Sequence, residues 1–220
     1  MDKLKVLNLY AGIGGNRKLW GDVEVTAVEH NEAIAAIYSD LYPQDKMIIG
    51  DAHAYLLEHF KEFDFIWGSP PCPTHSRFRL LWQSDNVEIG GKKTNASFKY
   101  PDMKLYEEII FLTHFSKALF CIENVISYYE PLIKPQKCNS HYYWANFNIK
   151  RLPDTKRHIR HREQNPKLKD FKDSLKKYEL GKRFEKKILN NCVEPETGLF
   201  ILNCARGVIQ SENVNQPQLF

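Results

Sequence analysis

Two short stretches of this sequence carry side chains that could perform chemistry together. The first is the "PPC" of residues 70–72, within "FIWGSPPCPTHSR", and the second is the "ENV" of residues 123–125, within "LFCIENV". A thiolate can add to an electron-poor ring, and a neighbouring carboxyl group can hold or supply a proton. Each stretch follows an apolar run typical of a buried strand. Cys72 and Glu123 are therefore the candidate catalytic pair.

The cysteine pattern limits the roles that Cys72 can have. The chain has five cysteines, which are widely spaced and form no CxxC pair. Disulfide frameworks and structural zinc sites use closely spaced or evenly paired cysteines. We therefore expect reduced thiols, no metal site and a cytoplasmic location. A nucleophile and a small core residue both remain open for Cys72.

The composition indicates a soluble globular protein. Hydrophobic residues make up 43% of the 220 residues and charged residues 26%, and no long apolar run occurs. The amino-terminal "MDKLKVLNLY" is too polar for a signal peptide. This length suits one domain with a sizeable core. We expect a monomer with no membrane association.

Positive charge is concentrated in one segment. Residues 150–187 contain 15 Lys and Arg against 6 Asp and Glu, which gives this segment a charge of +9. Because the net charge of the whole chain is +4, the remaining residues carry −5. Such a segment attracts polyanions, although a solvated basic helix has the same composition.

The first half of the sequence alternates between strand and helix patterns. The apolar runs predict strands over 4–10, 23–30, 46–53, 63–72 and 118–125. Amphipathic stretches predict helices over 32–42, 54–61, 102–116 and 196–209. Strands and helices that alternate in this way form βαβ units, so we expect an α/β fold with a doubly wound, mainly parallel sheet. Ligands bind at the carboxyl ends of such strands.

Three of these predicted strand ends suit a nucleotide-type cofactor. The glycine-rich "AGIGG" follows the first strand, Glu29 ends the second, and Asp51 ends the third. Glycines allow a ligand to approach the backbone, and an acid about 20 residues further on can hold ribose hydroxyls. Asp51 could bind an adenine amino group. Together they favour an adenosine-containing cofactor over three unrelated acidic loops.

Five stretches and two single acids, in this order, resemble the motifs of the DNA cytosine-5 methyltransferases. They are "LNLYAGIGG", the acids Glu29 and Asp51, "PPCPTHS", "PDMKLYEEI", "ENV" and "NNCVEP". The resemblance implies a Rossmann-like methyltransferase that transfers a methyl group from S-adenosyl-L-methionine to C5 of a flipped-out cytosine in DNA. It also implies that Cys72 is the covalent nucleophile and that Glu123 acts at the base.

The resemblance carries a set of cofactor-binding residues over to this chain. They are Tyr10, Ala11, Gly12, Gly14, Gly15, Glu29, His30, Asp51, Ala52, Pro71, Leu105, Asn191, Cys192 and Val193. His30 stands where the family often has a tryptophan against the adenine, and Asp102 would line the methionine part with Leu105. His75 matches an aromatic position, for which packing is the preferred interpretation over a base.

The sequence departs from the family at one functional motif. After "ENV" the family has Gln-x-Arg-x-Arg, whereas here Gln136 is followed by Cys138 and Ser140 at the arginine positions. Either Lys137, His141 or an arginine of 156–162 replaces them, or catalysis is impaired.

The nucleic-acid contacts are expected from two regions. Residues 77–100 are predicted to form a loop that closes over DNA. Residues 150–187 are predicted to form a short basic segment in place of a large target-recognition region. This segment would be inserted in a catalytic domain formed by residues 1–149 and 188–220. The candidate contacts are Ser76, Arg77, Arg79, Lys92, Lys93, Arg157, Arg160 and Arg162.

Several alternative functions remain open. RNA or single-stranded DNA could be the substrate, and a catalytically impaired nucleic-acid-binding relative would lack the activity. An amino-methyltransferase would have an aromatic residue in place of Cys72, and a nicotinamide dehydrogenase has no use for Cys72 with Glu123.

Overall fold

A seven-stranded sheet lies at the centre of the protein in the computed structural model, which describes residues 2–76, 88–89, 92–93, 101–138, 140–150 and 168–208. Its strands are β1 (Leu4–Leu9), β2 (Val23–Glu29), β3 (Lys46–Ile49), β4 (Phe65–Gly68), β7 (Leu119–Val125), β8 (Gln136–Cys138) and β9 (His141–Ala145). A separate antiparallel pair consists of β5 (Glu88–Ile89) and β6 (Lys92–Lys93).

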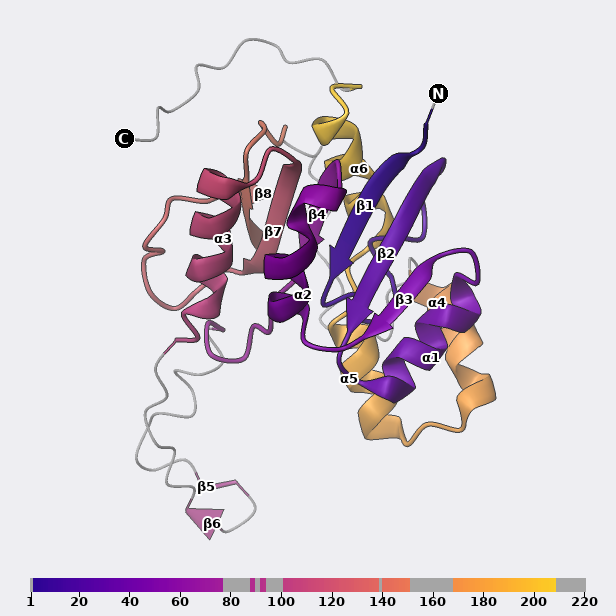
Figure 1. Cartoon of the computed structure of the whole chain (residues 1–220). Helices are drawn as coiled ribbons and strands as arrows, with labels where there is room; N and C mark the ends of the chain where they lie inside the picture. Colours follow the sequence, from indigo (N-terminus) through magenta and orange to yellow (C-terminus); the bar gives the residue numbers. More distant parts are fainter. Residues whose placement is uncertain are drawn as a thin grey trace.

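The sheet is mainly parallel, as the alternating pattern predicts. The strand order is β3-β2-β1-β4-β7-β9-β8 (Figure 1). The first five strands pair in parallel, whereas β9 is antiparallel to both β7 and β8. The strand order reverses between β1 and β4, which makes this the topological switch point of the sheet.

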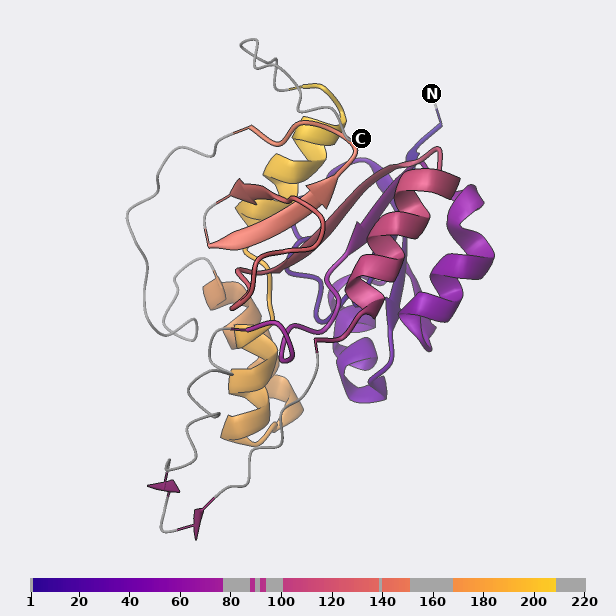
Figure 2. The ribbon, with the colours of Figure 1, turned by 90° about the vertical axis from the view of Figure 1, so that its left-hand side faces the viewer.

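Helices cover both faces of the sheet. They are α1 (Glu32–Leu41), α2 (Ala52–His59), α3 (Lys104–Phe115), α4 (Lys169–Leu175), α5 (Lys182–Asn190) and α6 (Pro195–Ala205), with 3-10 turns η1 (Phe60–Glu62) and η5 (Lys176–Tyr178). Apolar side chains of α1 and α6 form one core with the sheet, and those of α2 and α3 form the other. Figure 2 shows α3 and α2 on one side of the strands and α6 and α5 on the other. The predicted doubly wound α/β fold is therefore confirmed.

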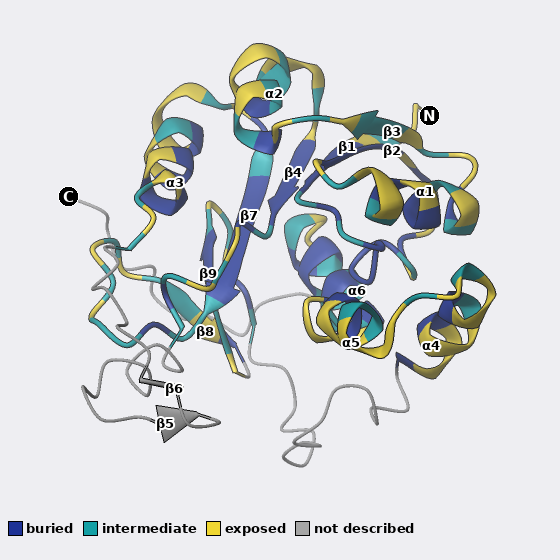
Figure 3. Ribbon diagram, turned by 90° about the horizontal axis from the view of Figure 1, so that it is seen from below, coloured by how far each residue is buried: buried dark blue, intermediate teal, exposed yellow. Residues whose placement is uncertain are grey.

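Helices α4 and α5 form a third apolar cluster at the carboxyl-end edge of the sheet. Their side chains pack against Ile13 of the glycine-rich turn and Ile37 of α1. Seen from this edge, the buried residues of α5 and α4 lie on their inner sides and the exposed ones outside (Figure 3). This amphipathic packing stabilises two helices that are otherwise rich in lysine.

Two predicted strands are shorter than expected. The third ends at Ile49 rather than residue 53, because the Asp51 side chain accepts a hydrogen bond from the Ala54 N–H at 2.9 Å and starts α2 at Ala52. The fourth covers only Phe65–Gly68, and residues 69–72 leave the ladder. The prolines in this stretch have no N–H with which to continue it.

In the described residues, every helix is too short or too polar to cross a lipid bilayer.

Candidate active site

A cavity of about 180 Å³ lies at the carboxyl ends of the parallel strands, beside the switch point. Tyr10 follows β1 on one side of the cavity, and Pro70 and Pro71 follow β4 on the other. Its lining residues are Tyr10, Val28, His30, Gly50, Asp51, Ala52, Pro70, Pro71, His75, Asp102, Lys104 and Leu105. The structure thus brings together half a dozen residues that the sequence nominates for a cofactor: Tyr10, His30, Asp51, Ala52, Pro71 and Leu105.

The glycine-rich turn after β1 is shaped by contacts with α1. Gly14 has a φ of +74°, and a Cβ there would lie 2.4 Å from a ring carbon of Tyr42. The Tyr42 hydroxyl donates to the Gly14 carbonyl at 2.7 Å. Only glycine combines this backbone conformation with so close an approach.

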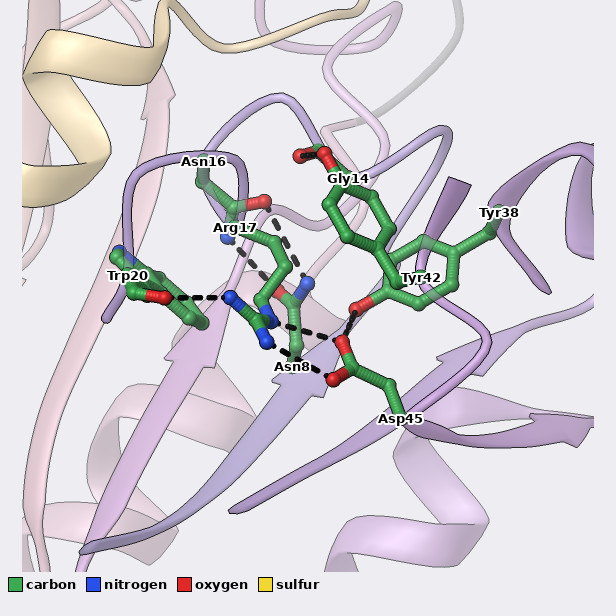
Figure 4. A network of polar contacts seen from close by, with 8 residues as sticks. All are labelled: Asn8, Gly14, Asn16, Arg17, Trp20, Tyr38, Tyr42 and Asp45. Atoms are coloured by element: carbon green, nitrogen blue, oxygen red, sulfur yellow. Dashed lines mark hydrogen bonds and ion pairs between the residues drawn. The ribbon is translucent and has the colours of Figure 1, made fainter. Parts of the chain in front are cut away.

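A buried polar network also supports the glycine-rich turn (Figure 4). The Asn16 amide donates to Asn8 of β1 at 2.8 Å. The Arg17 guanidinium bonds both oxygens of Asp45 at 2.8 and 2.9 Å. The Tyr38 hydroxyl of α1 donates to the same carboxylate. Because every charge in this network has a partner, it fixes the turn without leaving an isolated ion in the core.

The late "NNCVEP" motif returns to the turn from the far end of the sequence. A Cβ at Gly15 would lie 2.2 Å from the Val193 carbonyl oxygen and 2.4 Å from the Cys192 sulfur. Cys192 is buried, whereas Asn191 is exposed at the end of α5. Cys192 and Val193 therefore pack directly against the turn at Gly15.

Glu29 lies behind the turn and is 6% exposed. Its carboxylate accepts backbone N–H bonds from Gly12 at 3.1 Å and from Asn31 at 2.9 Å. The neighbouring Ala11 N–H bonds to the Val28 carbonyl, which continues the pairing of β1 with β2. Its Oε1 also lies 3.1 Å from His30 Nδ1. Glu29 therefore ties the turn to the start of α1, and Oε2 keeps a further lone pair for a ligand hydroxyl.

Asp51 combines two functions at the rim of the cavity. One oxygen caps α2, and this backbone hydrogen bond from Ala54 lowers the pKa of Asp51. The carboxylate is therefore ionised at neutral pH and can accept a hydrogen bond from an amino group.

Tyr10 is anchored by a buried acid. Its φ is +55°, which is unusual for a residue with a side chain. Its hydroxyl donates to Glu108 of α3, which also contacts His53 Nδ1 at 3.2 Å. Glu108 is fully buried, and this burial raises its pKa, although the bonds from Tyr10 and His53 oppose the shift.

The stretch that carries Cys72 is held against the end of β7. The Asn124 side chain donates to the Pro70 carbonyl at 3.1 Å, and Ser76 forms an isolated bridge with Ser127. Cys72 itself is half-buried rather than sealed in the core. Gly68 pairs with Ile122 in the ladder, so the "PPC" stretch leaves the sheet beside the "ENV" that ends β7.

Glu123 points toward a histidine of the antiparallel strand β9. It is 9% exposed, and its Oε1 lies 3.4 Å from His141 Nε2. Val125 pairs with His141 in the ladder, which places this imidazole beside the carboxylate. Of the substitutes considered for the family's arginines, Lys137 and His141 lie within the described residues, and His141 contacts Glu123.

Several predicted nucleic-acid contacts lie outside the described residues. They are Arg77, Arg79, Arg157, Arg160 and Arg162, with most of the predicted loop 77–100. For Lys92 and Lys93 the structure describes only the backbone of β6. Within the described ranges, no three His, Cys, Asp or Glu side chains form a group that could hold a metal ion.

Three contributions to the site were not foreseen from sequence. Lys104 lines the cavity two residues after Asp102 at the start of α3. Asn124 links the stretch that carries Cys72 to the stretch that carries Glu123. Glu108 lies in the buried stripe of α3 with Leu105, Ile109 and Leu112. An acid within such a stripe is a signal in the sequence, because an unpartnered carboxylate is rarely buried.

The sheet order, the two helical layers and the cavity at the switch point define a Rossmann-like α/β protein of the methyltransferase class. Residues 4–128, more than half of the chain, match the C-5 cytosine-specific DNA methylase family. This chain belongs to that family. No curated relative matches it.

Solved structures of low similarity include other methyltransferases. A putative methyltransferase from Escherichia coli, YhhF, is 14% identical over 64% of this chain and 74% of its own, with a TM-score of 0.41. A DNMT2 mutant from Spodoptera frugiperda is 22% identical over 56% of this chain, with a TM-score of 0.37. An E. coli prophage-encoded putative DNA modification methyltransferase is 19% identical over 58%, with a TM-score of 0.36. This chain spans only 36% and 34% of the latter two chains.

Proposed function

We propose that this protein is an S-adenosyl-L-methionine-dependent DNA methyltransferase that methylates C5 of a flipped-out cytosine through a covalent adduct with Cys72. The observation that carries the proposal is the bond from Asn124 to the Pro70 carbonyl. It joins the stretch that carries the half-buried thiol to the stretch that carries Glu123, next to a cavity with residues suited to an adenosine-bearing ligand.

The residues around the cavity fit the cofactor. Asp51 offers a carboxylate oxygen to the adenine amino group, and the exposed His30 ring can lie against the base. Leu105 and Asp102 would contact the methionine part. When bound, S-adenosylmethionine supplies the methyl group on an electrophilic sulfonium.

The chemistry on the base follows from the two catalytic side chains. The Cys72 thiolate adds to C6 of cytosine while Glu123 gives a proton to N3, so that electron density moves to C5. C5 would then take the methyl group from the sulfonium, whose S–CH3 bond breaks so that neutral S-adenosylhomocysteine is left. A base then removes the C5 proton, N3 returns its proton to Glu123, and the thiolate leaves C6. The net change replaces hydrogen by methyl at C5 and releases one proton.

His141 supports this assignment where the family's arginines are absent. Its Nε2 at 3.4 Å can orient the Glu123 carboxylate toward the base. His141 is thus proposed as the positioning residue for Glu123.

The substrate is proposed to be double-stranded DNA. A base stacked within a duplex cannot reach the half-buried Cys72 thiol, so the cytosine must rotate out of the helix at a cost of a few kcal/mol. The +9 charge of residues 150–187 suits phosphate contacts, which hold nucleic acid without reading its sequence. A short or relaxed recognition site is the expected consequence.

The test is transfer of tritiated methyl groups to duplex DNA, single-stranded DNA and RNA, followed by nucleoside analysis. We expect 5-methyldeoxycytidine in duplex DNA, loss of activity in Cys72→Ser, and retained activity in Cys204→Ser, which alters a buried thiol elsewhere. His141→Ala should slow transfer more than His141→Arg does. Methylation of RNA alone would mean that RNA, and not DNA, is the substrate. Binding of DNA without methyl transfer would instead favour a nucleic-acid-binding protein that lacks the activity.

A further inference from the structure

The imidazole of His75 has an unused nitrogen beside the cavity. His75 is 1% exposed and belongs to the cavity lining. Its Nε2 makes no hydrogen bond of good geometry in the part of the chain that the structure describes, although Asp102 is near enough to raise the pKa of the ring against the effect of burial. Buried polar atoms in folded proteins nearly always have a partner. A ligand in the cavity is the natural source of one for this nitrogen.

The main chain around His75 holds the ring in place. The His75 N–H bonds to the Cys72 carbonyl at 3.0 Å, and the His75 carbonyl accepts the Tyr128 N–H at 3.2 Å. Residue 75 is therefore fixed both to the turn that carries Cys72 and to the segment that follows β7. Its ring position is tied to the geometry of the active site.

A chain of hydrogen bonds sets which ring nitrogen carries the proton. The Leu132 N–H can only donate, and it bonds to the Tyr106 oxygen at 3.2 Å. The Tyr106 hydroxyl then donates to the Tyr129 oxygen at 3.3 Å, so the Tyr129 hydroxyl can donate its own proton to His75 Nδ1 at 2.5 Å. Burial lowers the pKa of His75, so the ring is neutral at neutral pH. A neutral ring that accepts at Nδ1 carries its proton on Nε2.

The charged neighbours in the cavity indicate what this N–H group meets. Lys104 and Asp102, at the start of α3, line the same cavity. An ammonium group, an N–H donor and a carboxylate in one place complement the two charges of an amino-acid zwitterion. The adenine-facing candidates His30 and Asp51 follow other strands of the sheet.

We propose that the His75 Nε2–H group and the Lys104 ammonium bind the carboxylate of the amino-acid part of the methyl donor, while Asp102 accepts its ammonium group. This inference rests on the proposed function. His75 thereby becomes a ligand-binding residue rather than the packing residue expected from sequence. It also couples the cofactor's amino-acid end to the backbone that positions Cys72.

Two ligands separate this role from a general effect on the site. S-adenosylhomocysteine has both the adenosine and the amino-acid part, whereas 5′-methylthioadenosine has no amino-acid part. Calorimetry with both ligands measures the contribution of that part. A hydrogen bond to a charged group changes affinity by about ten- to a hundred-fold.

His75→Phe keeps a ring of similar shape and removes both nitrogens. We expect it to weaken S-adenosylhomocysteine binding at least about tenfold and 5′-methylthioadenosine binding less than about twofold. His75→Gln, whose amide reaches close to the Nε2 position, should recover most of the loss. Equal losses for both ligands, or no loss for either, would overturn the proposal. A wild-type protein that binds neither ligand would instead overturn the proposed function.

A second variant tests the proton assignment without altering the imidazole. Tyr129→Phe removes the hydroxyl that donates to Nδ1. In the wild type, nitrogen-15 NMR should show His75 as the Nε2-protonated tautomer at neutral pH, and Tyr129→Phe should give a mixture with selectively weaker S-adenosylhomocysteine binding. An Nδ1-protonated ring in the wild type would contradict the proposal.

Discussion

At the scale of single residues, acidic side chains in and around the cavity lining hold the segments that form the cavity. Asp51 caps α2, Glu29 binds two backbone N–H groups, and Glu108 anchors Tyr10. A substitution at such a position therefore changes both folding and ligand binding. Conservative substitutions can separate the two effects because amide groups retain some of these bonds.

Asp51 offers such a separation. Asp51→Asn keeps a good N-cap, so we expect the free energy of unfolding to change by less than about 0.5 kcal/mol. Its affinity for S-adenosylhomocysteine should nevertheless fall, because an amide offers only one acceptor oxygen and that oxygen caps the helix. Asp51→Ala should lose the affinity and about 1 kcal/mol of stability as well. Urea denaturation and calorimetry measure the two quantities, and an Asn variant with full affinity would exclude Asp51 from the adenine site.

Glu108 should make stability depend on pH. Burial raises its pKa, so the folded protein holds this proton more tightly than the unfolded chain does. Protonation of Glu108 therefore stabilises the folded protein. This contribution to the free energy of unfolding is complete below the ordinary carboxyl pKa of about 4.3, and it is lost as the pH rises toward the pKa that Glu108 has in the folded protein. Relative to Glu108→Gln, the wild type should lose about 1.4 kcal/mol for each unit by which the pKa is raised. Urea denaturation of both proteins from pH 4 to 8 measures this comparison. A difference in the free energy of unfolding that stays constant with pH would contradict the prediction.

At the scale of elements, the glycine-rich turn is clamped between α1 and the segment that follows α5. The turn meets Tyr42 on one side and residues 192–193 on the other. The amino- and carboxyl-terminal parts of the described chain thus meet at the loop proposed to approach the cofactor. The packing of residues 191–193 against the glycine-rich turn therefore helps to fix the backbone conformation of the turn.

Gly15→Ala should disrupt that docking. The new methyl group would overlap the Val193 carbonyl and the Cys192 sulfur, so we expect a loss of about 1–3 kcal/mol and weaker S-adenosylhomocysteine binding. Gly21→Ala is the matched control, because nothing lies within 4 Å of a Cβ there. Urea denaturation should show the loss for Gly15→Ala alone. Equal stability of the two variants would mean that residues 191–193 move aside freely.

The elements also show what the sequence could predict. Alternating periodicity predicts the parallel sheet, and parallel strands bring Tyr10, Asp51 and Pro71 to one edge without further information. The contact of His141 with Glu123 depends on the register of the antiparallel β9, which no local pattern encodes. The chain of Tyr106, Tyr129 and His75 joins three distant segments and follows only from tertiary packing.

At the scale of the whole molecule, charge is separated along the chain. Residues 150–187 carry +9 while the remainder carries −5. Within the described part of that segment, some lysines are engaged with acids, as in the pair of Lys177 with Asp40. Binding of nucleic acid through this segment should release counterions and depend steeply on salt.

Raising salt from 50 to 200 mM should therefore weaken DNA binding by about two orders of magnitude or more. Replacing Arg157, Arg160 and Arg162 by serine should lower the slope of log affinity against log salt by about 2 to 3. Replacing the exposed Lys3, Lys61 and Lys117 is the matched control and should leave the slope unchanged. Fluorescence anisotropy measures both slopes. A response that stays flat in the wild type would exclude phosphate clamping by this segment.

The most direct test of the central claim is covalent trapping. A pool of random duplex DNA with 5-fluorocytosine in place of cytosine would be incubated with the protein and S-adenosylmethionine, because fluorine at C5 prevents the elimination that frees the thiol. We predict a denaturation-resistant adduct that mass spectrometry locates at Cys72 and that Cys72→Ser abolishes. A protein that binds both DNA and cofactor yet forms no adduct, or forms one at another cysteine, would contradict the account.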